Sequence, residues 1–185
     1  MDVKFNVAAI LKYKPKGTKL YDYLHNIDVE FNDVETTEIE TSIWCTREKG
    51  GYNELFGYSK LGTLRGWLDG LQILLPSKEM RDWSKFAWKK GDVLVSEDNV
   101  HIIFEKFEDD TYTRFKGKHY LWKECNVEDY NKEETKMLTS VFEKATDDVA
   151  QTYIKTIEEH LDGKLNLETL EIEKQLEVKD GDIVV

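Results

Sequence analysis

The stretch from residue 76 to residue 95 limits the possible folds more than any other part of the sequence. Pro76 ends the apolar run before it, because proline has no N–H to donate to a central strand. Ser77 is a suitable N-cap residue and predicts a short helix over 77–84. The turn-forming residues Lys-Lys-Gly-Asp then precede an apolar, β-branched run from Val93, which predicts a strand. The stretch therefore connects two sheet modules.

Three large aromatic residues, Trp83, Phe86 and Trp88, lie within six positions of one another in this stretch. Large aromatic side chains mostly fill cores, and the favoured interpretation is that these three fill the space between two sheets. The alternative is an aromatic ligand groove that includes Arg81. The candidate binding residues are Arg81, Trp83, Trp88, Tyr112 and Trp122.

The first module is predicted over residues 1–87. Asn6 is a suitable cap for a short leading helix, and apolar residues alternate with polar ones over 27–31 and 39–45, which predicts two strands. Four glycines in 57–70 interleave with apolar residues in a spacing that fits neither a P-loop nor a dinucleotide-binding motif. We interpret them as an irregular loop that packs on the sheet; an approach of its backbone to a ligand is the alternative.

The second module, 88–125, has the clearest strand pattern in the sequence. Short turn-like segments separate four β-rich runs and predict an antiparallel meander, which with twisted strands of this length would curl into a small SH3-like barrel or half-barrel. The four runs are 92–96, 100–107, 111–115 and 119–123.

Residues 126–174 are predicted to form helices and a β-hairpin. Apolar spacing predicts a helix over 131–144, and Thr146 begins a second amphipathic helix that Gly163 ends. Glu168 and Thr169 mark the turn of the hairpin, with four apolar residues on one face. Residues 175–185 repeat the turn-then-strand pattern and are expected to be a truncated third unit or a tail. The predicted fold class is α+β, with two small antiparallel β modules and a C-terminal helical and hairpin segment.

The net charge of −11 argues against nucleic-acid binding, because non-specific affinity for phosphates comes mainly from Lys and Arg. An acidic surface usually serves solubility, although it can also mimic nucleic acid. Cys45 and Cys125 lie far apart in sequence, which favours a reduced intracellular protein. The first residues lack the apolar core of a signal peptide, and no apolar run is long enough to span a membrane. We expect a cytoplasmic protein.

Residues with catalytic or metal-binding chemistry are scattered along the chain. The four histidines do not have metal-ligand spacing; His101, His119 and Cys125 are the one three-ligand combination considered, and solvent-facing strand histidines are the favoured alternative. No nucleophile elbow or carboxylate pair stands out among the 37 acidic residues. We therefore assign no catalytic residue, metal or cofactor, and an enzyme is the less favoured class.

Three segments carry a resemblance to other proteins: Pro-Lys-Gly-Thr-Lys-Leu-Tyr at 15–21, Leu-Leu-Pro-Ser-Lys-Glu-Met-Arg-Asp-Trp-Ser-Lys-Phe at 74–86, and Lys-Gly-Asp-Val-Leu-Val at 90–95. Together with the helix and hairpin of 146–174, they resemble a group of uncharacterised proteins of gut Bacteroidales and their phages or prophages. The resemblance implies a mobile-element context and assigns no role to any residue.

The sequence thus favours a protein-interaction module that engages a protein partner through an exposed sheet edge or an aromatic groove. A second hypothesis is a phage-encoded inhibitor of a host system, acting by acidic mimicry or by capturing a small nucleotide in a pocket with Arg65, Arg81 or Arg114. A third is a metal-dependent hydrolase, which would need clustered carboxylates.

Overall fold

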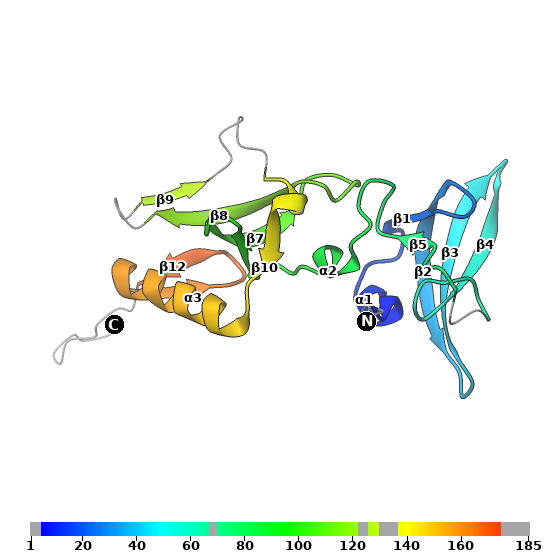
Figure 1. Cartoon of the computed structure of the whole chain (residues 1–185), viewed down its shortest axis with the longest axis horizontal. Coiled ribbons are helices and arrows are strands. Elements are labelled where there is room, and N and C mark those ends of the chain that lie inside the picture. Colours follow the sequence, from blue (N-terminus) through cyan, green and yellow to red (C-terminus); the bar gives the residue numbers. More distant parts are fainter. Residues whose placement is uncertain (1–4, 67–69, 122–125, 130–136, 175–185) are drawn as a thin grey trace, which may run out of the picture. The chain divides into compact units, whose positions relative to one another are not determined.

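The computed structural model describes residues 5–66, 70–121, 126–129 and 137–174. The chain forms two compact units. The first consists of the residues up to Ala87 together with Phe107–Arg114, and the second of Trp88–Lys106 together with the residues from Phe115 onward. Both units are built mostly of antiparallel sheets with few helices, as the predicted α+β class requires (Figure 1).

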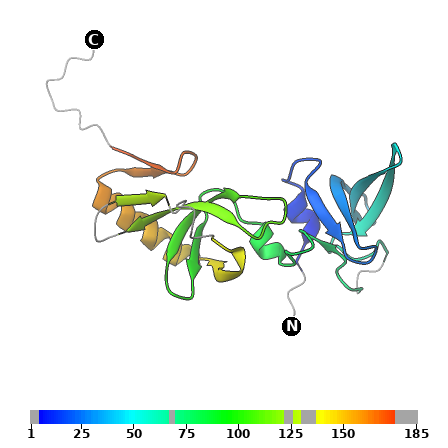
Figure 2. The same ribbon diagram turned by 90° about the horizontal axis from the view of Figure 1, so that it is seen from above.

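The first unit contains a five-stranded sheet with the order β4-β3-β2-β1-β5. Two glycines with positive φ, Gly50 and Gly51, form the tight turn between β3 and β4, a conformation that glycine adopts without strain. In Figures 1 and 2 these strands form one twisted sheet. The strands are β1 (Lys19–Asp22), β2 (Ile27–Thr36), β3 (Thr41–Lys49), β4 (Tyr52–Ser59) and β5 (Leu74–Leu75).

The core of this unit lies between the sheet and two short helices, α1 (Val7–Leu11) and α2 (Trp83–Phe86). The predicted cap of α1 is confirmed, because the Asn6 side chain accepts a hydrogen bond of 3.0 Å from the Ala9 N–H. The buried apolar side chains come from both helices and from alternating strand positions. They include Val7, Leu11, Leu20, Val29, Phe31, Ile43, Cys45, Leu74, Trp83 and Phe86.

The predicted helix over 77–84 is wrong for most of its length. The Ser77 hydroxyl accepts a bond from the Met80 N–H at 2.8 Å, so it closes a turn and does not cap a helix. The helix begins later, where the Asp82 carboxylate accepts from the Ser84 N–H at 2.9 Å. Either residue can satisfy a free N–H, and the sequence alone does not show which N–H continues into a helix.

Two strand boundaries in the first unit also differ from the prediction. Ile39 lies outside β3 in the turn after β2 and is 95% exposed. The start of the predicted loop 57–70 belongs to β4, where the exposed Leu55 beside the partly buried Glu54 breaks the regular alternation that marks a half-buried strand. Its later residues, as far as they are described, are irregular, as expected.

The second unit contains a sheet with the order β10-β6-β7-β8-β9. Its strands β6 and β7 match the first two runs of the predicted meander, whereas β8 takes the place of the two strands predicted at 111–115 and 119–123. The expected turn at 116–118 is wrong, because one continuous strand runs through it. Gly117 allows close packing there: a Cβ at this position would lie 2.5 Å from the Ile103 carbonyl oxygen. The strands are β6 (Val93–Ser96), β7 (His101–Phe107), β8 (Phe115–Leu121), β9 (Asn126–Asp129) and β10 (Phe142–Lys144).

The predicted helix over 131–144 is wrong over its described part. Residues Thr139–Val141 form a single 3-10 turn, and β10 follows and pairs with β6. The spacing of the apolar residues suggested one helical face, but Leu138 and Val141 are exposed while Phe142 is buried against the sheet. Residues 131–136 of this prediction, and the predicted strand or tail at 175–185, lie outside the described residues.

The helix α3 (Asp147–Leu161) lies across one face of the second sheet, as Figures 1 and 2 show. Tyr153 and Ile157 pack against Ile103 and Tyr120 of the sheet. The helix begins after Thr146, as predicted, although the Thr146 side chain makes no capping bond. The helix ends with Asp162 in the left-handed conformation, directly before the expected Gly163.

The predicted hairpin is confirmed as β11 (Lys164–Asn166) and β12 (Glu171–Glu173), with Leu165 opposite Ile172. Its four apolar residues do not all share one face, because Leu170 is buried and Leu167 is half-exposed.

Candidate interaction surface

Two of the predicted binding residues lie in cores. Trp83 is 1% exposed, and its indole N–H donates to the Leu74 carbonyl at 3.1 Å in the first unit. Trp88 is also buried and packs edge-on against Phe104 and Phe115 in the second unit. Both side chains therefore fill cores and present almost no surface to a partner.

The other predicted residues have different environments. Tyr112 is half-buried in the first unit, where its hydroxyl donates to the Lys19 carbonyl at 3.1 Å and burial raises its pKa to about 12. Arg81 is exposed, and its guanidinium carbon lies 5.1 Å from the ring centre of Tyr23. Trp122 lies outside the described residues. The contact between Arg81 and Tyr23 therefore belongs to a surface that the sequence analysis did not predict.

A buried carboxylate organises that surface. Asp22 ends β1 and is fully buried. Its two oxygens accept from the His25 N–H at 2.9 Å and from the Tyr58 hydroxyl at 2.6 Å, and the second oxygen also lies 2.8 Å from His25 Nδ1. A carboxylate can only accept a hydrogen bond, so His25 Nδ1 carries a hydrogen and donates it to Asp22. A buried carboxylate needs such donors to offset its lost hydration.

The bonds to Asp22 fix the turn that follows β1 and bring apolar and aromatic side chains to the surface. Tyr23 and Leu24 are 47% and 59% exposed, and the His25 side chain is partly exposed and tilted against Phe56 at 5.7 Å. The Tyr23 N–H donates to the Ile73 carbonyl at 2.8 Å, which holds the turn from its other side. We call this surface the Tyr23 patch and define it as Tyr23, Leu24, His25, Phe56 and Arg81.

Two ionisable groups beneath the patch are held in their neutral forms. Burial, with a smaller contribution from the Asp22 charge, raises the pKa of the Cys45 thiol to about 12. Burial and the hydrogen bond to Asp22 raise the pKa of Tyr58 well above its ordinary value. The neutral thiol and hydroxyl therefore add no charge to this part of the core.

The outer face of the same sheet carries an open, polar groove of about 520 Å³. An ion pair between Lys19 and Glu30 crosses it, and the Tyr21 hydroxyl donates to Asn26 at 2.5 Å. The hydrogen bond to Glu30 raises the pKa of Lys19 despite some desolvation. The groove's lining combines three cationic and three carboxylate residues: Lys19, Arg47 and Lys78 with Asp28, Glu30 and Glu48. Because these charges balance, the groove favours no ligand of one charge.

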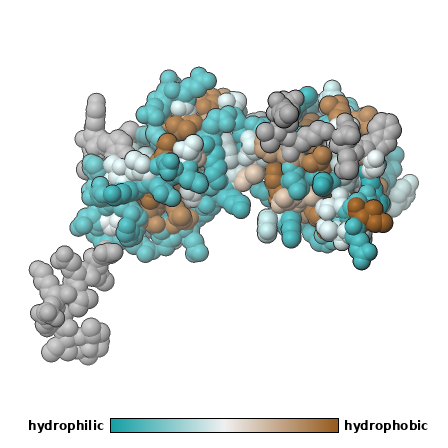
Figure 3. Space-filling view, turned by 60° about the horizontal axis from the view of Figure 1, so that its bottom comes forward, coloured by the Kyte–Doolittle hydropathy of each residue, from teal (hydrophilic) through white to brown (hydrophobic). Residues whose placement is uncertain are grey.

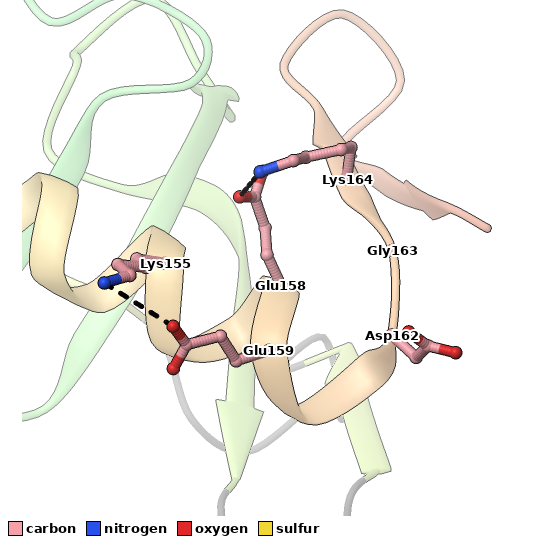
Figure 4. A pocket seen from close by; sticks show the side chains of 6 residues that line it. All are labelled: Lys155, Glu158, Glu159, Asp162, Gly163 and Lys164. Carbon is pink, nitrogen blue, oxygen red and sulfur yellow. Dashed lines mark hydrogen bonds and ion pairs between the residues drawn. The ribbon is translucent and has the colours of Figure 1, made fainter. Parts of the chain in front are cut away.

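A smaller hollow of about 230 Å³ lies in the second unit, where α3 leads into β11 (Figure 4). Glu158 accepts from the Lys164 ammonium at 2.6 Å and from the Leu165 N–H at 3.1 Å, and these bonds lower its pKa. Lys155 and Glu159 form a second pair at 3.6 Å on the same helix. Four of the charged residues that line this hollow thus form two ion pairs, and the Glu158–Lys164 pair links the helix to the hairpin.

The predicted histidines His101 and His119 contact other groups of the second unit. His119 Nδ1 lies 2.8 Å from the His101 carbonyl oxygen, and the His101 ring stacks on Tyr153 at 4.9 Å. Cys125, the third residue of the predicted combination, lies outside the described residues. Throughout the described part of the chain, no group of three or more His, Cys, Asp or Glu side chains could hold a metal ion.

Comparisons with protein-family models, with curated proteins and with solved structures found no match to this chain. The described helices are all too short or too polar to cross a membrane. Figure 3 shows apolar side chains reaching the surface of both units among hydrophilic ones.

The sequence reasoning missed four of the five members of the Tyr23 patch. A local signal was present, because Asp22 lies at the end of an apolar strand and aspartate side chains often accept from backbone N–H groups of the residues that follow. The contacts with Phe56 and Tyr58 join residues more than thirty positions apart and leave no local signal.

Proposed function

We propose that the protein is a protein-interaction module that binds a partner protein through the Tyr23 patch. The observation that carries this proposal is the buried Asp22 carboxylate, whose hydrogen bonds to the His25 N–H and the Tyr58 hydroxyl anchor the turn that exposes Tyr23 and Leu24. A preorganised surface loses little conformational entropy when it binds, so more of its contact energy appears as affinity.

The composition of the Tyr23 patch supports the same proposal. Tyrosine and arginine are enriched among the residues that contribute most to binding at protein interfaces, and Arg81 lies over the Tyr23 ring. Leu24 and Phe56 add apolar area next to them, as at the centre of an interface with a polar rim.

The wider context of the proposal comes from the sequence. The resemblance of residues 74–86 to proteins of gut Bacteroidales and their phages supports a role within a mobile element. The buried, free thiol of Cys45 supports a reducing, cytoplasmic compartment. The meander β6–β9 supports an SH3-like half-barrel as the architecture of the second unit.

The alternative functions receive no specific support from the described residues. Neither the groove nor the hollow is lined by Arg65, Arg81 or Arg114, which nucleotide capture would use. The Arg65 guanidinium donates instead to Glu40, at 2.6 and 2.8 Å. Acidic mimicry and metal-dependent hydrolysis likewise rest on composition alone.

Site-specific photocrosslinking tests the proposal. A photoreactive amino acid replaces Leu24 in one variant and Ile39, an exposed apolar residue outside the patch, in the control. In lysate of the host cell, the Leu24 variant should crosslink one protein that the Ile39 variant does not, and Tyr23→Ala should abolish that product. Equal products at both positions, or no effect of Tyr23→Ala, would contradict the proposal.

A further inference from the structure

The edge of β4 has backbone groups that no described residue satisfies. β4 is the outermost strand of its sheet and pairs along its whole length with β3 on one side only (Figure 1). In an antiparallel ladder, successive residues direct their N–H and C=O groups alternately toward one neighbour and toward the other. Half of the β4 residues therefore direct these groups away from β3.

Two independent observations show which residues these are. The two-residue turn closes between Lys49 and Tyr52, which directs the groups of Tyr52 toward β3. At the other end, the Ser59 N–H donates to the Thr63 carbonyl at 2.9 Å, so the groups of Ser59 point away from β3. Because the strand has no bulge between these ends, Asn53, Leu55 and Gly57 point outward as well.

The open part of the edge is short and bounded. A bridge between Tyr58 and Leu64 brings the following loop beside the C-terminal end of β4 and covers the edge there. The tight turn limits the other end. Within the described residues, the outward N–H and C=O groups of Asn53 and Leu55 have no hydrogen-bond partner. Leu55 is 60% exposed.

We propose that this edge accepts a short, extended, uncharged apolar segment of a partner protein, which adds a strand to the sheet at Asn53 and Leu55. Unpaired backbone groups on an edge strand select another peptide backbone as their ligand. The charges of β3 and β4 cancel, because Arg47 and Lys49 balance Glu48 and Glu54, so the edge favours no charged segment. An apolar side chain of the segment would cover Leu55. This site is distinct from the Tyr23 patch, and either proposal can fail without the other.

The test uses a capped five-residue peptide of alternating threonine and valine and measures amide exchange of the full chain by NMR. At saturating peptide, the Asn53 and Leu55 amides should exchange about tenfold more slowly, while Glu54 and Phe56, already directed toward β3, should not change. The matched control is the same peptide N-methylated at its three central residues, which should have no effect. An acidic version, alternating glutamate and valine, should bind more weakly.

Protein variants give a second measurement. Leu55→Pro removes the outward N–H and should abolish the effect of the peptide, while Leu55→Thr keeps the N–H and should retain it. The peptide control does not depend on the folding of either variant. The proposal is overturned if the N-methylated peptide acts equally, if the acidic peptide binds as well as the neutral one, or if saturating peptide leaves the Asn53 and Leu55 amides unchanged.

Discussion

At the scale of single residues, Asp22 connects the buried core of the first unit to its exposed turn. Its carboxylate is fully buried and accepts hydrogen bonds from the Tyr58 hydroxyl, the His25 N–H and the His25 ring. Hydrogen bonds to a charged buried group contribute more to stability than neutral ones, and leaving their donors unsatisfied is costly. Asp22 therefore connects the stability of the fold to the conformation of the exposed turn.

Asp22→Asn should destabilise the protein, because an amide cannot accept from all three donors and brings two donors of its own into the core. We expect the free energy of unfolding to fall by about 2 kcal/mol in urea titrations. Asp28→Asn is the matched control, since Asp28 is exposed on the next strand, and it should change the value by less than about 0.5 kcal/mol. Equal effects of the two substitutions would show that Asp22 is not a structural anchor.

The thiol of Cys45 provides a pH-dependent prediction. With its folded pKa raised to about 12, the native thiol stays protonated at pH 8, and alkylation with iodoacetamide should be at least about a hundredfold slower than in the unfolded chain. The unfolded thiol loses its proton at a lower pH, so above that pH the unfolded state binds fewer protons and stability should fall as pH rises toward 12.

Mass spectrometry of the peptide that contains Cys45 measures the alkylation rate. Cys45→Ser, compared with the native chain between pH 8 and pH 11, isolates the contribution of the thiol to the pH dependence. Rapid alkylation of the native chain at pH 8 would contradict the assigned environment.

At the scale of the elements, close packing between neighbouring strands decides where a glycine is required. A Cβ on Gly117 would lie 2.5 Å from both the Ile103 carbonyl oxygen and the Ile102 side chain. Because one of these atoms belongs to the backbone of β7, the strands would have to separate to relieve the contact.

Gly117→Ala should therefore lower the free energy of unfolding by about 2–3 kcal/mol, measured by chemical denaturation. The control is Lys118→Ala in the same strand, which should change it by less than about 0.5 kcal/mol. If Gly117→Ala leaves the free energy of unfolding unchanged, β7 and β8 can move apart at no cost.

The elements also show how far a single sequence predicts this fold. The α3 helix, the β11–β12 hairpin and the strands β6 and β7 each follow from local periodicity and turn residues, and these predictions are correct. The predicted strand over 111–115 is wrong, because β8 begins only at Phe115. The strands β4 and β10 were missed because each lies at a sheet edge, where one side lacks a partner and the alternation is weak. Gly117 resembled a turn signal because the sequence does not show that a neighbouring backbone lies close to it.

The candidate surface was less predictable than the fold. Trp83 and Trp88 were predicted as binding residues because large aromatic residues serve both cores and interfaces. Burial distinguishes the two uses only in the folded chain. The Tyr23 patch depends on contacts between β1 and β4, whose residues lie far apart in the sequence.

At the scale of the whole molecule, the excess of acidic residues leads to a prediction about nucleic-acid binding. With a net charge of −11, the protein should show no retention of duplex DNA or RNA in gel-shift experiments at physiological salt. Raising the charge by replacing exposed Glu97 and Asp98 with lysine is a control for the assay's response to charge. Specific retention of nucleic acid by the native chain would contradict the prediction and would require a local basic surface.

The first unit is assembled from two pieces of the chain, and this affects the order of events during synthesis. Its strand β1 receives a hydrogen bond from Tyr112, a residue 93 positions further along, and Ser77 donates to the carbonyl of Thr111. A ribosome therefore releases the last part of this unit only after β6 and β7 of the other unit have been made. During translation, the N-terminal strands therefore lack the contacts of residues 107–114 until that segment has been synthesised.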